Sequence, residues 1–230
     1  MSTPKTFSAL LLGGFPWSRT SIPQEALPFG DGTVLDRVIA AYRDAGAQKL
    51  VLALGPQEPS LELAADPHRS TADVVRVSGE RRGLGNYLVA GLEALDASGG
   101  AIAIGLCDMA LLTPELVETL WRAYREAGRP LGVPLCQGVL GHPLFVSPEL
   151  QDELIAQHGR RTHRDLLLAH PDDVTVLPTD YTAVLRSIED LGDYQEMLEI
   201  AGLPPTDLRA YRESLRERLG TGGPASDPTG

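Results

Sequence analysis

The chain of 230 residues lacks several features that would assign it to particular protein classes. It has only two cysteines, Cys107 and Cys136, which form no C-x-x-C pair and no disulfide framework, so the sequence favours a reducing compartment. No stretch reaches the roughly 18 apolar residues that a membrane span requires. The N-terminal segment has one lysine, a short apolar run and no cleavage-like site, so we expect no signal peptide and predict a cytoplasmic protein without a membrane partner.

Basic residues are also scarce, because 20 Lys and Arg stand against 31 Asp and Glu and the formal net charge is −11. Binding to DNA or RNA needs clustered Lys and Arg, so we expect no nucleic-acid partner. A single nucleotide is compatible with this charge, since a backbone loop and a metal ion can hold its phosphates. The motifs GxGxxG and GxxxxGK[ST] are absent, which excludes a dinucleotide fingerprint and a P-loop.

The sequence does contain apolar strand-like runs that alternate with amphipathic stretches. Strands are expected at residues 7–14, 49–55, 73–79, 101–109 and 173–188, a strand and a loop at 132–147, and helices at 33–46, 85–100, 113–128, 148–159 and 160–171. The helix at 113–128 has Thr113 as its N-cap and Pro114 at its first position. This alternation predicts an α/β fold, a Rossmann-like three-layer α/β/α architecture with a mostly parallel sheet.

The end of the chain differs from the rest. Residues 1–200 are predicted to form the main domain, residues 203–220 a separate C-terminal helix, and residues 221–230 a disordered tail. Leu208, Tyr211, Leu215 and Leu219 form an apolar stripe on that helix. The stripe indicates either packing on the chain's own domain or docking to a protein partner.

Two features follow apolar strands and are candidates for ligand binding. Gly13 and Gly14 could direct backbone N–H groups at a phosphate, although a plain tight turn explains them equally well. Asp108 ends the apolar run 101–109, where a charge is costly unless it is paired or binds a metal. Because Thr113 already caps the next helix, Asp108 is not needed as its cap, which favours a Mg²⁺ ligand over a turn aspartate.

Histidines provide a third candidate. His142 lies between Gly141 and Pro143, a restrained backbone that could direct the imidazole into a cleft, and the alternative is a loop histidine without a role. The spacings of His158, His163 and His170 fit no metal template, so we expect them at the surface.

In their order, these segments resemble the MobA-like nucleotidyltransferases, in particular the molybdenum-cofactor cytidylyltransferase branch. That family begins with a strand and the loop L-A-A-G-x-S-x-R-M-G, followed by a lysine, Leu-Pro and a short hairpin. Here the matching stretch is "LLLGG", then Ser18-Arg19, then Leu27-Pro28-Phe29. "GLCDMALLTPELVETL" is similar to the segment that carries the family's metal-binding aspartate, "GHP" to its GHP motif, and "SIEDLGDYQEML" to its closing segment.

The resemblance covers residues 7–198 and implies a GT-A-like nucleotidyltransferase. Such an enzyme transfers a nucleoside monophosphate from an NTP (CTP or GTP), with Mg²⁺, to a small phosphorylated acceptor such as a molybdopterin-type cofactor. It implies nucleotide-binding residues Leu12, Gly13, Gly14, Ser18, Arg19, Gln24, Gly83 and Asp108, among which Arg19 and Asp108 are catalytic, metal ligands Asp108 and Glu189, and acceptor-binding residues Gly141 and His142.

This sequence departs from the family at several chemically important positions. Gln24 stands at the loop lysine and cannot supply a cation, and Ser187 stands at the first acid of the closing segment. Glu189 could equally be a solvated acid at a helix start beside Asp190. A second hypothesis is therefore a catalytically weakened nucleotide-binding or accessory maturation protein of the same fold. A glycosyltransferase is disfavoured because the sequence has no D-x-D pair.

Overall fold

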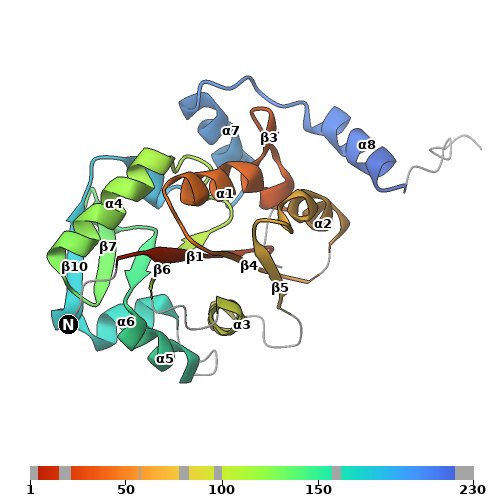
Figure 1. The fold of residues 1–230 in the computed structure, drawn as a ribbon. Helices are drawn as coiled ribbons and strands as arrows, with labels where there is room; N and C mark the ends of the chain where they lie inside the picture. Colours follow the sequence, from red (N-terminus) through yellow and green to blue (C-terminus); the bar gives the residue numbers. More distant parts are fainter. Residues whose placement is uncertain are drawn as a thin grey trace, which may run out of the picture.

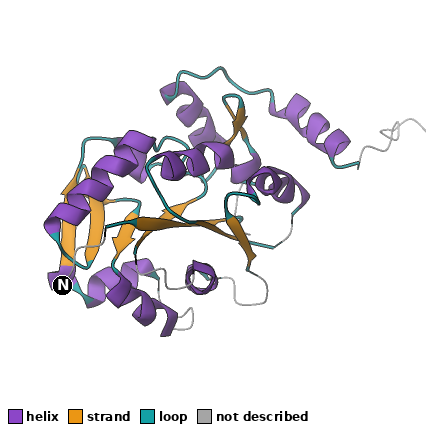
Figure 2. Ribbon diagram, in the orientation of Figure 1, coloured by secondary structure: helices purple, strands orange, loops and turns teal. Residues whose placement is uncertain are grey.

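The computed structural model describes residues 5–15, 22–56, 58–77, 83–95, 100–156 and 162–220. These residues form a central sheet with helices on both faces, which confirms the predicted α/β/α fold (Figure 1). Strands and helices alternate along most of the chain, and a helical segment follows the last strand (Figure 2).

The main sheet has eight strands within the described residues, and most of its neighbouring pairs are parallel. The strands are β1 (Phe7–Gly13), β4 (Leu50–Leu54), β5 (Asp73–Arg76), β6 (Ala101–Leu106), β7 (Leu131–Cys136), β8 (Val139–Leu140), β9 (Leu144–Val146) and β10 (Val174–Pro178). Their order is β10-β7-β9-β6-β1-β4-β5, with β8 paired to β7, and β9 runs antiparallel to both β6 and β7. A separate hairpin joins β2 (Pro28–Phe29) and β3 (Gly32–Thr33).

Helices cover both faces of this sheet (Figure 1). One face carries α1 (Val34–Asp44), α2 (Pro59–Ala65) and α4 (Pro114–Ala127), and the other α3 (Leu84–Leu95), α5 (Pro148–Ala156) and α6 (His163–Ala169). The last two helices of the described residues are α7 (Leu191–Ile200) and α8 (Leu208–Arg218). Short 3-10 turns are η1 (Gln24–Ala26), η2 (Asp66–His68), η3 (Pro171–Asp173) and η4 (Thr182–Leu185). No helix in the described ranges is long and apolar enough to cross a membrane.

Local signals account for many of these boundaries. The side chain of Thr113 accepts a hydrogen bond from the backbone N–H of Leu116, which confirms it as the N-cap of α4. The strands expected across residues 173–188 are only partly confirmed, because β10 ends at Pro178 and residues 182–185 form η4. Sequence periodicity also did not indicate α2, which has only seven residues.

The first strand contributes to two hydrophobic cores. Ala9 and Leu11 pack in the core under α1 and α4, whereas Leu10 and Leu12 pack in the core under α3, and all four are fully buried. A strand buried on both faces has no reason to alternate with polar residues, which explains the continuous apolar run at 7–13.

The C-terminal helix α8 packs on the chain's own domain. Leu215 is 4% exposed and belongs to the core under α1, and the Tyr211 hydroxyl donates a hydrogen bond of 2.7 Å to the carbonyl of Ala26. Leu208 and Leu219 are half-buried. Most of the apolar stripe is therefore used internally, which is one of the two alternatives that the sequence left open. The tail predicted at 221–230 lies outside the described residues.

Candidate nucleotide site and adjoining cavity

The strand order creates a place where two loops diverge. From β1 the chain moves outward to β4 and β5 on one side, and then β6 pairs with the opposite side of β1. Leu12 lies opposite Leu106 in this parallel pair, so the carboxyl ends of β1 and β6 are neighbours. Open α/β sheets bind ligands at such a switch point, and both Gly14 and Asp108 lie there.

The two glycines after β1 each have a packing reason. Gly14 has a φ of +65°, and a side chain there would meet Leu61 and the backbone of Gly55. A Cβ on Gly13 would meet Cys107 and the carboxylate of Glu25. A tight, crowded turn therefore explains both glycines, and a role in phosphate binding stays a prediction.

Glu25 is a site residue that sequence reasoning missed. It lies in η1, is 2% exposed, and its Oε1 accepts a hydrogen bond from the backbone N–H of Gly14. Burial raises the pKa of this carboxyl, and the hydrogen bond from Gly14 opposes the shift. The available sequence signal was an acid next to Gln24 in an otherwise apolar stretch, but only the tertiary fold brings it to Gly14.

Asp108 is held in a similar environment. Its Oδ1 is buried and has no hydrogen-bond partner among the described residues. Burial raises the pKa of Asp108 to about 8, and the nearby carboxylates of Glu25 and Glu189 act in the same direction. A hydrogen bond from the backbone N–H of Ile188 opposes this shift. The site thus concentrates carboxyl groups where little solvent reaches them, which disfavours their charged forms.

Gln24 connects the site to the closing segment. Its side chain is 8% exposed, and its Nε2 donates a hydrogen bond of 3.1 Å to the carbonyl of Ile188. This amide is therefore engaged in holding two segments together, and its predicted contact with a nucleotide stays a prediction. Glu189 is exposed next to Asp190, the N-cap of α7, yet its charge acts on Asp108.

A cavity of about 350 Å³ lies between the sheet and helices α3 and α6. We call it the acceptor cavity because it contains the two residues that the family resemblance predicts to bind an acceptor. Its lining residues are Leu84, Leu106, Val133, Leu140, Gly141, His142, Leu144, Thr162, Arg164 and Leu167. The predicted acceptor residues Gly141 and His142 both lie in it. Their backbone N–H groups donate to the carbonyls of Pro134 and Val184, at 2.9 and 2.8 Å, which fixes the position of the loop.

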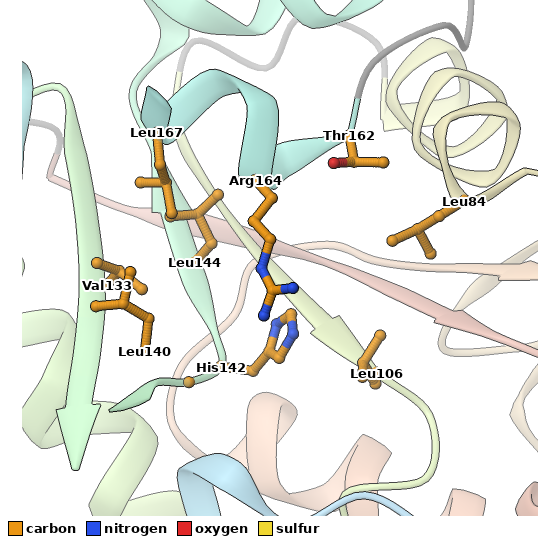
Figure 3. A pocket seen from close by; sticks show the side chains of 10 residues that line it. Leu84, Leu106, Val133, Leu140, His142, Leu144, Thr162, Arg164 and Leu167 are labelled. Carbon is orange, nitrogen blue, oxygen red and sulfur yellow. The ribbon is translucent and has the colours of Figure 1, made fainter. Parts of the chain in front are cut away.

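Two polar side chains of this cavity, those of Arg164 and His142, lie close together (Figure 3). Arg164 extends from α6 toward the imidazole of His142, with leucines around the pair (Figure 3). Arg164 takes part in none of the ion pairs found among the described residues. Burial lowers the pKa of His142, a hydrogen bond with the Ile104 backbone opposes this, and the Arg164 charge lowers it further. The cavity therefore offers one guanidinium cation beside a neutral imidazole.

The remaining predicted residues do not all lie at the switch point or in the acceptor cavity. Leu12 is buried in β1, and its carbonyl accepts a hydrogen bond from the backbone N–H of Cys107. Gly83 is exposed just before α3.

Ser18 and Arg19 lie outside the described residues, as does His158, and the side chain of His163 is not described. His170, predicted at the surface, is half-buried and pairs with Glu153 at 2.7 Å. The described residues contain no group of three or more His, Cys, Asp or Glu side chains able to hold a metal.

A family model for the MobA-like NTP transferase domain matches residues 11–174. The chain belongs to this family. The match begins within β1 and ends at the first residue of β10, so it includes the switch point and every residue that lines the acceptor cavity. As a MobA-like NTP transferase, the chain is a nucleotidyltransferase in general terms. No curated protein matches the sequence.

Several solved structures share the MobA-like fold. Rv0371c from Mycobacterium tuberculosis H37Rv is 24% identical, with a TM-score of 0.70 over 86% of this chain and 100% of that one. Its complex with manganese is 25% identical, with a TM-score of 0.65 over 84% and 98%. Molybdopterin-guanine dinucleotide biosynthesis protein A from Archaeoglobus fulgidus is 15% identical, with a TM-score of 0.62 over 86% and 99%.

Proposed function

We propose that the chain transfers a nucleoside monophosphate from CTP or GTP to a small phosphorylated acceptor and releases pyrophosphate, with Mg²⁺ as its cofactor. The observation that carries this proposal is the buried Oδ1 of Asp108 at the switch point, which is unsatisfied among the described residues. Asp108 lies two residues after Leu106, which lines the cavity that contains the Arg164 guanidinium. Membership of the MobA-like NTP transferases supports the reaction class. A molybdopterin-type acceptor is supported by the similarity to the Archaeoglobus protein.

The chain's own residues would mainly position the reactants. Backbone groups at Leu12 to Gly14 and near Gly83 would contact the nucleotide, and Arg19, by the family resemblance, would neutralise its leaving phosphates. Gly141 and His142 would orient the acceptor. An oxygen of the acceptor phosphate attacks the α-phosphorus, and the bond to the bridging oxygen of pyrophosphate breaks. Because a phosphate dianion attacks without losing a proton, this step requires no general base.

The chemistry of the site fits a divalent cation. Asp108 has a buried oxygen without a hydrogen bond, and Mg²⁺ is commonly held by one or two carboxylates together with substrate phosphates. Asp108 would hold the ion, with Glu189 at the edge of the site. When bound, the cation would offset the negative charge of the phosphates. The manganese complex of Rv0371c supports a divalent metal at this fold.

One observation favours the second hypothesis, a catalytically weakened relative that binds a nucleotide or acts as a maturation factor. The Gln24 amide is buried and bonded to Ile188, so this position supplies no positive charge to phosphates. A protein partner at α8 would have to use the surface left by Leu208, Leu219 and their polar neighbours, because Leu215 is buried.

Thermal unfolding of the full chain with CTP, GTP, ATP and UTP, each with and without Mg²⁺, tests the proposal. A ligand at 100 times its Kd stabilises a protein by about 2.7 kcal/mol, which is measurable. We expect a Mg²⁺-dependent shift with CTP or GTP that Asp108→Asn removes, whereas Asp180→Asn, at an exposed position, keeps it. No shift with any of the four nucleotides would contradict the proposal. A shift without pyrophosphate release on addition of acceptors would favour the weakened relative.

A further inference from the structure

We propose that Glu25 is a second protein ligand of the divalent cation, together with Asp108. This inference rests on the proposed function, because it assigns a new residue to the same metal. It differs from the family resemblance, which placed the second acid in the closing segment at Glu189.

The two carboxyl groups are arranged alike although they come from separate parts of the chain. The Glu25 carboxylate accepts a hydrogen bond from the backbone N–H of Gly14, and that of Asp108 accepts one from the N–H of Ile188. Each group retains one buried oxygen, Oε2 and Oδ1 respectively, that has no hydrogen bond from a described residue. Each carboxyl is thus fixed on one side and unsatisfied on the other.

The two groups also share one buried region at the end of β1. A Cβ on Gly13 would contact both Glu25 Oε1 and Cys107, the residue just before Asp108. The absence of a side chain at Gly13 therefore leaves room for Glu25 beside the end of β6. The negative charge of Glu25 acts on Asp108, which is consistent with this proximity.

No positive side chain in the described part of the molecule offsets this pair. Neither Glu25 nor Asp108 takes part in any ion pair found there. Ionising a buried, unpaired carboxyl costs several kcal/mol, and ionising two neighbouring ones costs more. A hard cation removes both penalties, and two carboxylates complete the protein share of a typical Mg²⁺ site, the rest being water and phosphate.

The proposal also gives a reason for two departures from the family pattern. Ser187 stands where the family has the first acid of the closing segment, and Gln24 stands where the family has the loop lysine. In the structure Gln24 anchors η1 to Ile188, and the residue after it supplies a carboxylate to the same region. The acid missing from one segment is replaced from another.

A purely structural role for Glu25 predicts different behaviour. If its carboxylate served only to accept the Gly14 N–H, removing its charge would leave metal affinity unchanged. If it binds the cation, removing its charge weakens metal binding and at the same time relieves repulsion in the metal-free protein.

The test uses the full chain and Mn²⁺ alone, without nucleotide. Electron paramagnetic resonance measures the unbound Mn²⁺, and thermal unfolding measures the stabilisation by Mn²⁺. We expect Glu25→Gln and Asp108→Asn each to weaken Mn²⁺ binding at least tenfold and to raise the melting temperature of the metal-free protein. Glu118→Gln, which removes an exposed acid on α4, should change neither quantity.

The outcomes separate this inference from the proposed function. If Asp108→Asn loses Mn²⁺ but Glu25→Gln binds it like the unsubstituted protein, Glu25 is not a ligand and the proposed function stands. If both variants bind normally, the metal role of this site is wrong as well. Should Glu25→Gln fail to fold, Glu25→Asp keeps the charge on a side chain one methylene shorter. A folded Glu25→Asp protein with undiminished Mn²⁺ affinity would overturn the inference.

Discussion

The carboxyl ends of β1 and β6 and the acceptor cavity differ in how their charges are satisfied. At the strand ends, Glu25 is buried and Asp108 is half-buried, and each has one buried oxygen without a hydrogen bond from the described residues. In the acceptor cavity, leucines surround a neutral His142 and the guanidinium of Arg164. The two places are separated by little more than β6, since Leu106 lines the cavity and Asp108 follows two residues later.

The difference shows that each place is complementary to a ligand of the opposite sign. Acids with no ion-pair partner among the described residues favour a cation, and an arginine that forms no described ion pair favours an anion. The proposed Mg²⁺ and the proposed phosphorylated acceptor have these charges. Although the net charge of the chain is −11, Arg164 supplies a positive charge in the acceptor cavity, where the proposed anionic acceptor would bind.

The largest expected effect comes from crowding the turn at the strand ends. Gly14→Ala forces an alanine to a φ of +65°, at a cost of about 1–2 kcal/mol, and adds contacts with Leu61 and Gly55. Gly128→Ala is the matched control, because Gly128 has a φ of +62° and nothing within 4 Å of its Cβ position. Urea unfolding should show a larger loss of stability for Gly14→Ala. Equal losses would mean that the turn is not constrained by its neighbours.

Removing the cation of the acceptor cavity should affect anion binding alone. Hydrogen bonds to charged groups contribute about 1.5–3 kcal/mol, so Arg164→Ala should weaken binding of phenyl phosphate roughly 10- to 100-fold. The leucine and valine side chains of the lining predict that phenyl phosphate stabilises the protein more than glycerol phosphate does. Thermal unfolding with each compound measures both effects. Mn²⁺ binding should not change, and a parallel loss of Mn²⁺ binding would show that the two places are not independent.

A smaller effect is expected where α8 supports the loop that carries Glu25. The Tyr211 hydroxyl donates to the carbonyl of Ala26, the residue after Glu25, and such a bond contributes about 1 kcal/mol. Tyr211→Phe should lower the free energy of unfolding by that amount, and Tyr181→Phe, at a residue 67% exposed, should not. Chemical denaturation of both variants tests this. If the two are equally stable, α8 does not brace the loop.

The smallest expected effect is the contribution of His142 to the pH dependence of stability. The pKa of His142 is below its usual 6.5 in the folded protein, so just below pH 6.5 the unfolded chain binds a proton that the folded chain does not. His142 therefore lowers stability progressively as the pH falls through 6.5, until the pH reaches its folded pKa. His142→Gln should reduce the loss of melting temperature between pH 7.5 and 5.5. An unchanged loss of melting temperature would mean that protonation of His142 does not affect stability between pH 7.5 and 5.5.

Much of the fold could be predicted because its signals are local. Thr113 and Pro114 mark the start of α4, and the apolar runs of β1 and β6 indicate strands buried on both faces. Asp108 could be located at the edge of the sheet because it directly follows an apolar strand. Short elements without a full periodic pattern, such as α2 and η4, escaped this reasoning.

The α/β class, the order of the longer strands and helices, and the acid and the histidine that follow particular strands can be read from neighbouring residues. The contact of Glu25 with the Gly14 N–H and the direction of Arg164 toward His142 are visible in the folded chain alone. Those placements depend on how η1 and α6 pack against distant strands, and side-chain direction across such distances is set by packing, which no local pattern encodes.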